Sequence, residues 1–265
     1  MTAAPELHPL GALMRRFAVD WLDRADPAVP AEIMAPDYTI VIGAYTMRGR
    51  EDYVEATSGQ LARFPGLTIT VHDALYTPDG RVALRFTEHG ASARGGAAAW
   101  RGIGLFTARD GVLVHNACEE DYLGRRRQLH GGAPDPVDPP MVAPWTEPVA
   151  GPDTGAEEAV RSWLAAGRVT GPLPGVVADD GRGADPVLDD VTCEVTALFA
   201  AGRRVAFHAV ARGRYAGGLP DAPGATGTPV ALGIAGLVEP GADGTVTGHV
   251  VRDRLGLHRT LERAR

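Results

Sequence analysis

Apolar residues in the first part of the chain recur at the spacing of helices. The pattern predicts a helix over residues 10–24, a short helix over 31–35 and a third helix over 51–64. Between the last two, residues 37–47 are rich in β-branched and aromatic side chains and contain Gly43, which indicates a hairpin. This part of the chain is therefore expected to form three helices and one pair of short strands.

After residue 66 the pattern changes, and apolar and polar residues alternate with a period of two. This alternation predicts strands over residues 67–77, 82–90, 100–108 and 112–120. Asp110-Gly111 is a tight-turn signal between the last two of these strands. Helices followed by a long antiparallel meander are typical of an α+β domain with its helices on one face of a curved sheet. Such a sheet forms a cone with one open mouth, which is a natural pocket for a small molecule.

The acids at 119–121 end the last strand, and a basic helix is expected over 123–129. Residues 131–153 contain seven prolines and predict a semi-rigid linker. The expected organisation is therefore one domain over residues 1–130, the linker, and a second domain over residues 154–265.

The second half of the sequence repeats the first. GRVALRF at 80–86 matches RRVAFHA at 203–209, and EEDYLGRRRQL at 119–129 matches VRDRLGLHRTL at 251–261. The second match gives Asp253 the position that the acid before the basic helix has in the first copy. The second copy is shorter by about nineteen residues, equivalent to part of the first hairpin and third helix. The pocket of the second copy is therefore expected to have a different wall, to be filled by side chains, or to be absent.

Composition limits the chemistry that the chain can perform. The formal net charge is −7, which argues against a nucleic-acid partner or an anionic membrane. All 26 basic residues are arginine, which excludes Schiff-base chemistry through lysine and a phosphate-loop lysine. Cys118 and Cys193 are expected to be free thiols. No signal peptide or membrane span is recognisable, so a cytoplasmic location is expected, and no metal or other cofactor is signalled.

Four segments of the first half resemble the SnoaL-like polyketide cyclases of the NTF2-like superfamily. They are MRGRED at 47–52, ARFPGLTITVHD at 62–73, RVALRFTEHG at 81–90 and DGVLVHNACEEDYLGRRRQL at 110–129. DRLGLHRTL at 253–261 fits the same pattern in the second half. The resemblance implies two cone-shaped NTF2-like α+β barrel domains, each a curved antiparallel sheet around N-terminal helices, with the second copy shortened. The family's usual His-Trp pair before the acid is replaced here by Asn116-Ala117.

In these cyclases the acid at the position of Asp121 is the general acid/base of an intramolecular aldol condensation. The resemblance implies this role for Asp121, and Asp253 is the corresponding candidate in the second copy. Burial in an apolar cone would raise the pKa of such a carboxyl group and make it a better base at neutral pH. An aspartate at this place would serve equally well as a helix N-cap.

Three other acids are candidates for the same site. Glu119 has the strand parity of Asp121, so both are expected on one face of the sheet. At a sheet edge, however, Glu119 and Glu120 would be solvated charges. Asp37 begins a strand near the expected pocket, although an aspartate after a proline is more often a turn residue.

Residues on neighbouring strands complete the candidate site. His89 and Arg101 are candidate donors to a developing oxyanion, and a structural role for His89 remains open. The residues expected to contact the substrate are Tyr38, Phe86, Glu88, Trp100 and Arg101.

Three functions remain open. The leading hypothesis is a cofactor-independent cyclase or isomerase that acts on a hydrophobic, oxygenated small molecule of the polyketide type. An epoxide hydrolase or epoxide-opening cyclase would instead need convergent carboxylates, for which Asp37, Glu88 and Asp121 are candidates. A non-catalytic ligand-binding or scaffold protein would have a filled cone. Members of the superfamily commonly dimerise through the open sheet face, so a monomeric pseudo-dimer is expected, with a homodimer as the alternative.

Overall fold

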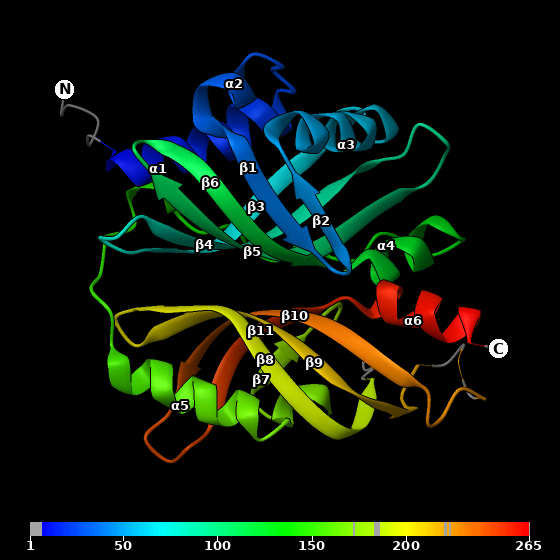
Figure 1. Ribbon diagram of the computed structural model, residues 1–265. Coiled ribbons are helices and arrows are strands. Elements are labelled where there is room, and N and C mark those ends of the chain that lie inside the picture. Colours follow the sequence, from blue (N-terminus) through cyan, green and yellow to red (C-terminus); the bar gives the residue numbers. More distant parts are fainter. Residues whose placement is uncertain (1–6, 172, 183–185, 220–221, 223, 265) are drawn as a thin grey trace.

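The computed structural model describes residues 7–171, 173–182, 186–219, 222 and 224–264. Figure 1 shows helices, a sheet, a second sheet and a further helix stacked in that order. The first sheet has six strands and the second has five. Each sheet has helices on its outer face and packs its other face against the other sheet, so each half of the chain is an α+β unit.

The helices of the first half cover one face of the first sheet. They are α1 (Pro9–Arg15), η1 (Arg16–Asp23), α2 (Val29–Ile33) and α3 (Arg50–Arg63). η1 is a π-helical continuation of α1, which matches the expected helix over 10–24. Phe17 and Trp21 of η1 are buried in the core between these helices and the sheet.

The first sheet has the order β2-β1-β6-β5-β4-β3. Its strands are β1 (Met34–Ile42), β2 (Tyr45–Arg48), β3 (Thr68–Tyr76), β4 (Arg81–Ala91), β5 (Ala97–Arg109) and β6 (Val112–Glu120). Neighbouring strands are antiparallel except β1 and β6, which pair in parallel because the meander returns the chain beside β1. Helix α4 (Tyr122–Leu129) follows β6 directly.

The second half repeats this topology with the order β7-β11-β10-β9-β8. Its elements are α5 (Thr154–Ala165), η3 (Arg168–Thr170), β7 (Val176–Ala178), β8 (Val187–Ala201), β9 (Arg204–Gly217), β10 (Pro229–Pro240), β11 (Val246–Arg252) and α6 (Arg254–Arg263). β7 pairs in parallel with β11, as β1 does with β6. Within the described residues, no strand corresponds to β2 and no helix to α3, which is the shortening expected from the sequence.

A separate apolar core joins the two sheets. It consists of Leu75, Ala83, Ile103, Leu105, Phe199, Ala201, Ala206, Ala235, Leu237 and Val251. The sheets of one chain therefore pack as a pseudo-dimer.

The proline-rich connection runs along the first domain. Met141 N donates to Val71 O, Ala150 N donates to Tyr76 O, and Trp145 of η2 (Pro144–Thr146) packs on the first core. None of the described helices is long and apolar enough to span a membrane.

Candidate active site

Strand alternation sends the side chains of the central strands to opposite faces of the first sheet. Glu88 of β4 and Glu120 of β6 point to the concave face, which the helices cover. Ile103 of β5 and Glu119 of β6 point to the convex face, where the second domain packs. The concave face and its helices form the cone that the sequence predicts.

Glu88 and Glu120 converge across a glycine of the strand between them. Glu88 lies opposite Trp100 of β5, and Glu120 lies opposite Gly102. A Cβ atom on Gly102 would lie 2.4 Å from Cε2 and Cζ of Phe86 and 3.1 Å from Cγ of Glu120. A glycine here therefore leaves the space that these side chains occupy.

Hydrogen bonds fix both carboxylates. Trp100 Nε1 donates to Glu120 Oε2 at 2.7 Å, and Gln60 Nε2 of α3 donates to Glu88 Oε2 at 2.7 Å. Arg125 Nη1 of α4 donates to Gln60 Oε1 at 3.1 Å, and its guanidinium lies 4.9 Å from the Trp100 ring centroid. The network thus holds the carboxylate pair between α3, the sheet and α4.

Burial acts on both carboxyl groups. It raises the pKa of Glu88 well above its usual range, and the neighbouring Glu120 carboxylate raises it further. Burial also raises the pKa of Glu120. The hydrogen bond from Trp100 and the charge of Arg125 oppose the rise in both groups. The two carboxyl groups therefore titrate as a pair, and their surroundings favour retention of a proton by that pair.

The pair lies in a cavity of about 120 Å³ inside the cone. Most of its wall is apolar, with polar groups from Tyr53, Thr57, Asn116 and Tyr122. Asn116 Oδ1 is buried and has no hydrogen-bond partner in the part of the chain that the structure describes, so a polar group of a ligand would satisfy it. Among the described residues, no three His, Cys, Asp or Glu side chains are grouped so as to hold a metal ion.

Asp121 does not line this cavity. Its Oδ1 atom accepts hydrogen bonds from Gly124 N at 3.1 Å, as a helix N-cap, and from Arg254 Nη2 of the second domain at 2.7 Å. Arg254 also pairs with Asp179, at 3.2 Å between Nε and Oδ2. Burial raises the pKa of Asp121 to about 6, although Arg254 opposes the rise. The residue therefore caps α4 and joins the two domains.

Glu119 of β6, like Asp121, contacts the second domain. Its Oε1 atom is 3.0 Å from His208 Nε2 of β9, and its Oε2 atom accepts a hydrogen bond from Gly43 N at 3.1 Å. Glu119 and Glu120 are only 1% and 9% exposed, so their expectation as solvated edge charges is wrong. β6 is an interior strand, with the cone on one face and the second domain on the other.

The residues expected to contact a substrate lie mostly in or beside the cone. Phe86 and Glu88 line its cavity. Tyr38 and Trp100 are buried next to it, and Tyr38 packs edge-on against Tyr53.

Three other candidates are not brought to the carboxylate pair. His89 Nε2 is 2.9 Å from Thr70 Oγ1 of β3, and His89 is not part of the cavity wall. Arg101 Nη1 donates to the backbone oxygen of Asp179 in the second domain at 2.7 Å. Asp37 is exposed on β1 and is not part of the cavity wall.

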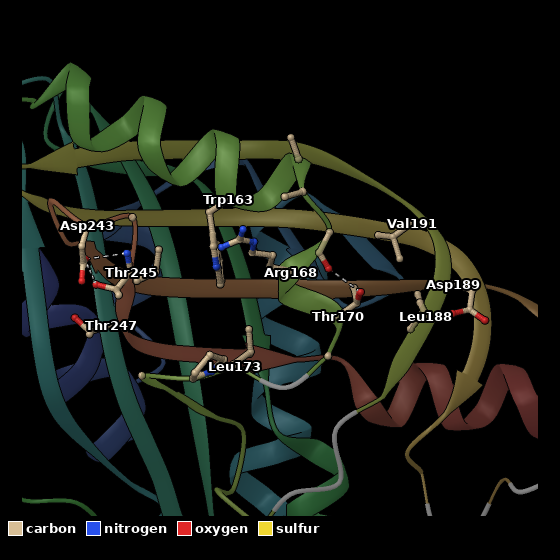
Figure 2. Close-up of a pocket in the computed structure, with 18 of the residues that line it drawn as sticks. Trp163, Arg168, Thr170, Leu173, Leu188, Asp189, Val191, Asp243, Thr245 and Thr247 are labelled. Atoms are coloured by element: carbon tan, nitrogen blue, oxygen red, sulfur yellow. Dashed lines mark hydrogen bonds between the residues drawn. The ribbon is translucent and has the colours of Figure 1, made fainter.

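The second domain has a different hollow, and its described residues include no equivalent carboxylate pair. Asp253 caps α6, with Gly256 N donating to its Oδ1 at 2.8 Å. An open hollow of about 1100 Å³ lies beneath α5, where Figure 2 shows Trp163, Arg168, Asp189 and Asp243 around its rim. The acids in its wall, Asp189, Asp190 and Asp243, are exposed to solvent.

The sequence did not identify Glu120, Gln60, Arg125 and Asn116 as site residues. Two of these residues could have been grouped from the sequence. Asn116 and Glu120 are four residues apart on β6, so the alternation of the strand puts both side chains on one face. Which face of β6 carries the cone, however, depends on the packing of the whole sheet.

Comparison with known proteins finds similarity in the first half of the chain. Residues 14–116 match the SnoaL-like domain family. TsrD from Streptomyces laurentii is 26% identical over 48% of this chain and 99% of its own, with a TM-score of 0.42. An LEH-like epoxide hydrolase of M. tuberculosis is 16% identical over 48% of this chain and 94% of its own, with a TM-score of 0.41. No curated protein gives a match to the sequence.

The family match ends within β6 and so covers the helices and most of the sheet that form the cone. The second half has the same strand order without β2 and α3. Residues 14–116 therefore match the SnoaL-like domain family, and the second half is a shortened unit with the same strand order.

Proposed function

We propose that the first domain is a cofactor-independent enzyme that acts on a hydrophobic, oxygenated small molecule by general acid/base catalysis. The buried Glu88–Glu120 pair is the observation that carries this proposal. A carboxylate and a carboxylic acid side by side in an apolar cavity provide a base and an acid at the same pH. Each proton transfer of this kind contributes roughly 10²–10⁴-fold to a rate.

For a cyclase or isomerase, Glu120 would accept the proton from a carbon next to a carbonyl group. Glu88 would give its proton to the oxygen that becomes negative, so that no net charge develops in the cavity. After ring closure by aldol addition, transfer of the proton from Glu120 to Glu88 restores the pair. In the movement of a double bond, Glu120 gives its proton to another carbon of the enol, and Glu88 takes back the proton of the enol oxygen. This mechanism serves ring closure by aldol addition as well as movement of a double bond.

Epoxide opening is the second candidate, and the convergence of two carboxylates favours it over a mechanism with a single acid. Glu120 would take a proton from water or from a substrate hydroxyl group, whose oxygen then forms a bond to an epoxide carbon. The C–O bond of the epoxide breaks, and its oxygen takes the proton of Glu88. Asn116 Oδ1, which is buried without a hydrogen bond to a described residue, would orient the attacking group.

A scaffold with a filled cone is the least supported alternative, because the cone contains a cavity with polar groups. The proposal is tested by incubating the protein with aromatic polyketones and with epoxides, and by identifying cyclised, isomerised or diol products. Glu120→Gln and Glu88→Gln are expected to lower kcat at least 100-fold for the reactive class. Glu55→Gln changes an exposed acid of α3 and serves as the matched control.

Asp121→Asn distinguishes this assignment from the one that the family resemblance implies. A folded Asp121→Asn protein that keeps its kcat supports the Glu88–Glu120 pair. Loss of turnover in Asp121→Asn, with full activity in Glu120→Gln, would transfer the catalytic role to Asp121.

A further inference from the structure

The cone cavity is small for the substrate class proposed above. Pockets that enclose drug-sized ligands measure about 300–1,000 Å³, whereas this cavity measures about 120 Å³. It has room for the reacting end of a molecule, and the rest of a larger substrate must lie elsewhere.

A second cavity of about 260 Å³ adjoins the first, and Ile42 and Tyr122 line both. This second space, called here the α4–α6 cavity, lies between the β1–β2 turn, α4 and α6. Its wall includes Tyr45, Tyr122, Arg125, Leu255, Arg259 and Arg263. The first domain supplies one side and the C-terminal helix of the second domain supplies the other.

The charged groups of the α4–α6 cavity favour an anion. Leu255, Arg259 and Arg263 are spaced four residues apart, so they share one face of α6. Both arginines of this face are exposed. Arg263 Nη2 donates to Thr260 Oγ1 at 3.3 Å. Burial raises the pKa of the nearby Asp253, and the charge of Arg259 opposes that rise. The third arginine, Arg125, already stacks on Tyr122, at 4.2 Å from its ring centroid.

The two acids of the cavity are already bonded within the protein. Glu119 is held by His208 and by the Gly43 amide, and burial raises its pKa well above its usual range. Asp253 accepts the hydrogen bond of the Gly256 amide as the N-cap of α6. The arginines of α6 are therefore the groups best placed to meet a ligand from solution.

We infer that the α4–α6 cavity binds an anionic group, such as a carboxylate, at the far end of a substrate whose reacting end enters the cone. This inference rests on the proposed function and extends it, because the second domain then determines specificity without performing chemistry. Arg259 and Arg263 are the specificity residues, and Ile42 and Tyr122 form the passage between the two spaces.

The binding test uses two probes that share one ring system. Rhein is a dihydroxyanthraquinone carboxylic acid, and aloe-emodin has a hydroxymethyl group in place of the carboxylate. Their affinities are measured by calorimetry for the wild type, for Arg259→Gln/Arg263→Gln and for Arg126→Gln. Arg126 is an exposed arginine of α4 outside the cavity wall and is the matched control.

The wild type is expected to bind rhein more tightly than aloe-emodin. The double variant is expected to lose rhein affinity roughly tenfold or more, as for loss of a charge-assisted hydrogen bond, and to keep its aloe-emodin affinity within about twofold. Equal affinities of the wild type for the two probes would overturn the inference. So would an unchanged rhein affinity in the double variant, or an equal loss in Arg126→Gln.

The inference and the proposed function fail separately. Glu120→Gln should abolish turnover and leave rhein binding unchanged. With an epoxide that carries a carboxylate, Arg259→Gln should raise KM and leave kcat within about twofold. Arginine-dependent rhein binding without any turnover would retain the anion site and remove the proposed catalysis.

Discussion

Gly102 provides the sharpest test of the carboxylate pair, because its missing side chain makes room for two others. In a Gly102→Ala protein the new methyl carbon would lie 2.4 Å from two ring atoms of Phe86. Carbon atoms in contact are normally about 3.5–4.0 Å apart, so the ring must move by more than 1 Å. Phe86 lines the cone cavity, and the free space into which it can move is that cavity.

The expected cost is that of overpacking, about 1–3 kcal/mol of unfolding free energy. For a chain of this size, each 1 kcal/mol lowers Tm by about 2–4 °C. The displaced ring and the push on Glu120 are together expected to reduce kcat/KM more strongly than stability. Thermal unfolding and steady-state kinetics of the same preparation give both quantities.

Gly59→Ala is the matched control, because an added Cβ in this exposed part of α3 meets no atom within 4 Å. It should stabilise the protein by about 0.5–1 kcal/mol, as alanine does in place of glycine within helices. If Gly102→Ala has the wild-type Tm and activity, Phe86 and Glu120 do not lie over Gly102 and the proposed pair is refuted.

Four further predictions concern the interface between the domains. Arg254→Met should cost about 3–5 kcal/mol in urea unfolding, because it removes the arginine that pairs with the buried Asp121 carboxylate. Asp121→Asn should cost less, because Arg254 keeps its ion pairs with Asp179 and Asp180, and the double variant should lose less than the sum. In the folded state the pKa of Asp121 is raised from 3.8 to about 6. Its contribution to stability is therefore complete below about pH 4 and is lost as the pH rises to about 6. The free energy of unfolding should fall less between pH 4 and pH 7 in Asp121→Asn than in the wild type. Burial lowers the pKa of His208 to about 4. The NMR signals of its ring should therefore remain those of a neutral imidazole from pH 8 to pH 5. A transition near pH 6.5 would contradict the buried contact with Glu119. Light scattering should give the mass of one chain if the pseudo-dimer completes the sheet interface, whereas a homodimer would leave that prediction wrong.

The elements of the first domain are largely predictable from the sequence because its helices and strands have distinct hydrophobic periods. β6 begins and ends at the predicted residues, 112 and 120. The parallel pairing of β1 with β6 was not predicted, because periodicity describes each strand alone and not its neighbours.

The site was harder to predict for a physical reason. A strand with one buried face shows which side chains point inward, but both faces of β6 are covered. Strand parity correctly groups Glu119 with Asp121, yet it cannot show that this face meets the second domain. Glu120 points into the cone because it is the next residue along the strand.

The elements that the second domain shares with the first are those that form the interface between the two sheets. It lacks counterparts of β2 and α3 within the described residues, and these are elements that enclose the first cone. It retains the strands whose side chains build the core between the sheets, and it retains an N-cap aspartate before its last helix. The residue after that aspartate is Tyr122 in the first copy, where it lines the cone cavity, and Arg254 in the second, where it pairs with Asp121. The same position therefore contributes to the pocket in the first copy and to the contact between the domains in the second. This difference is expected if only the first cone performs chemistry.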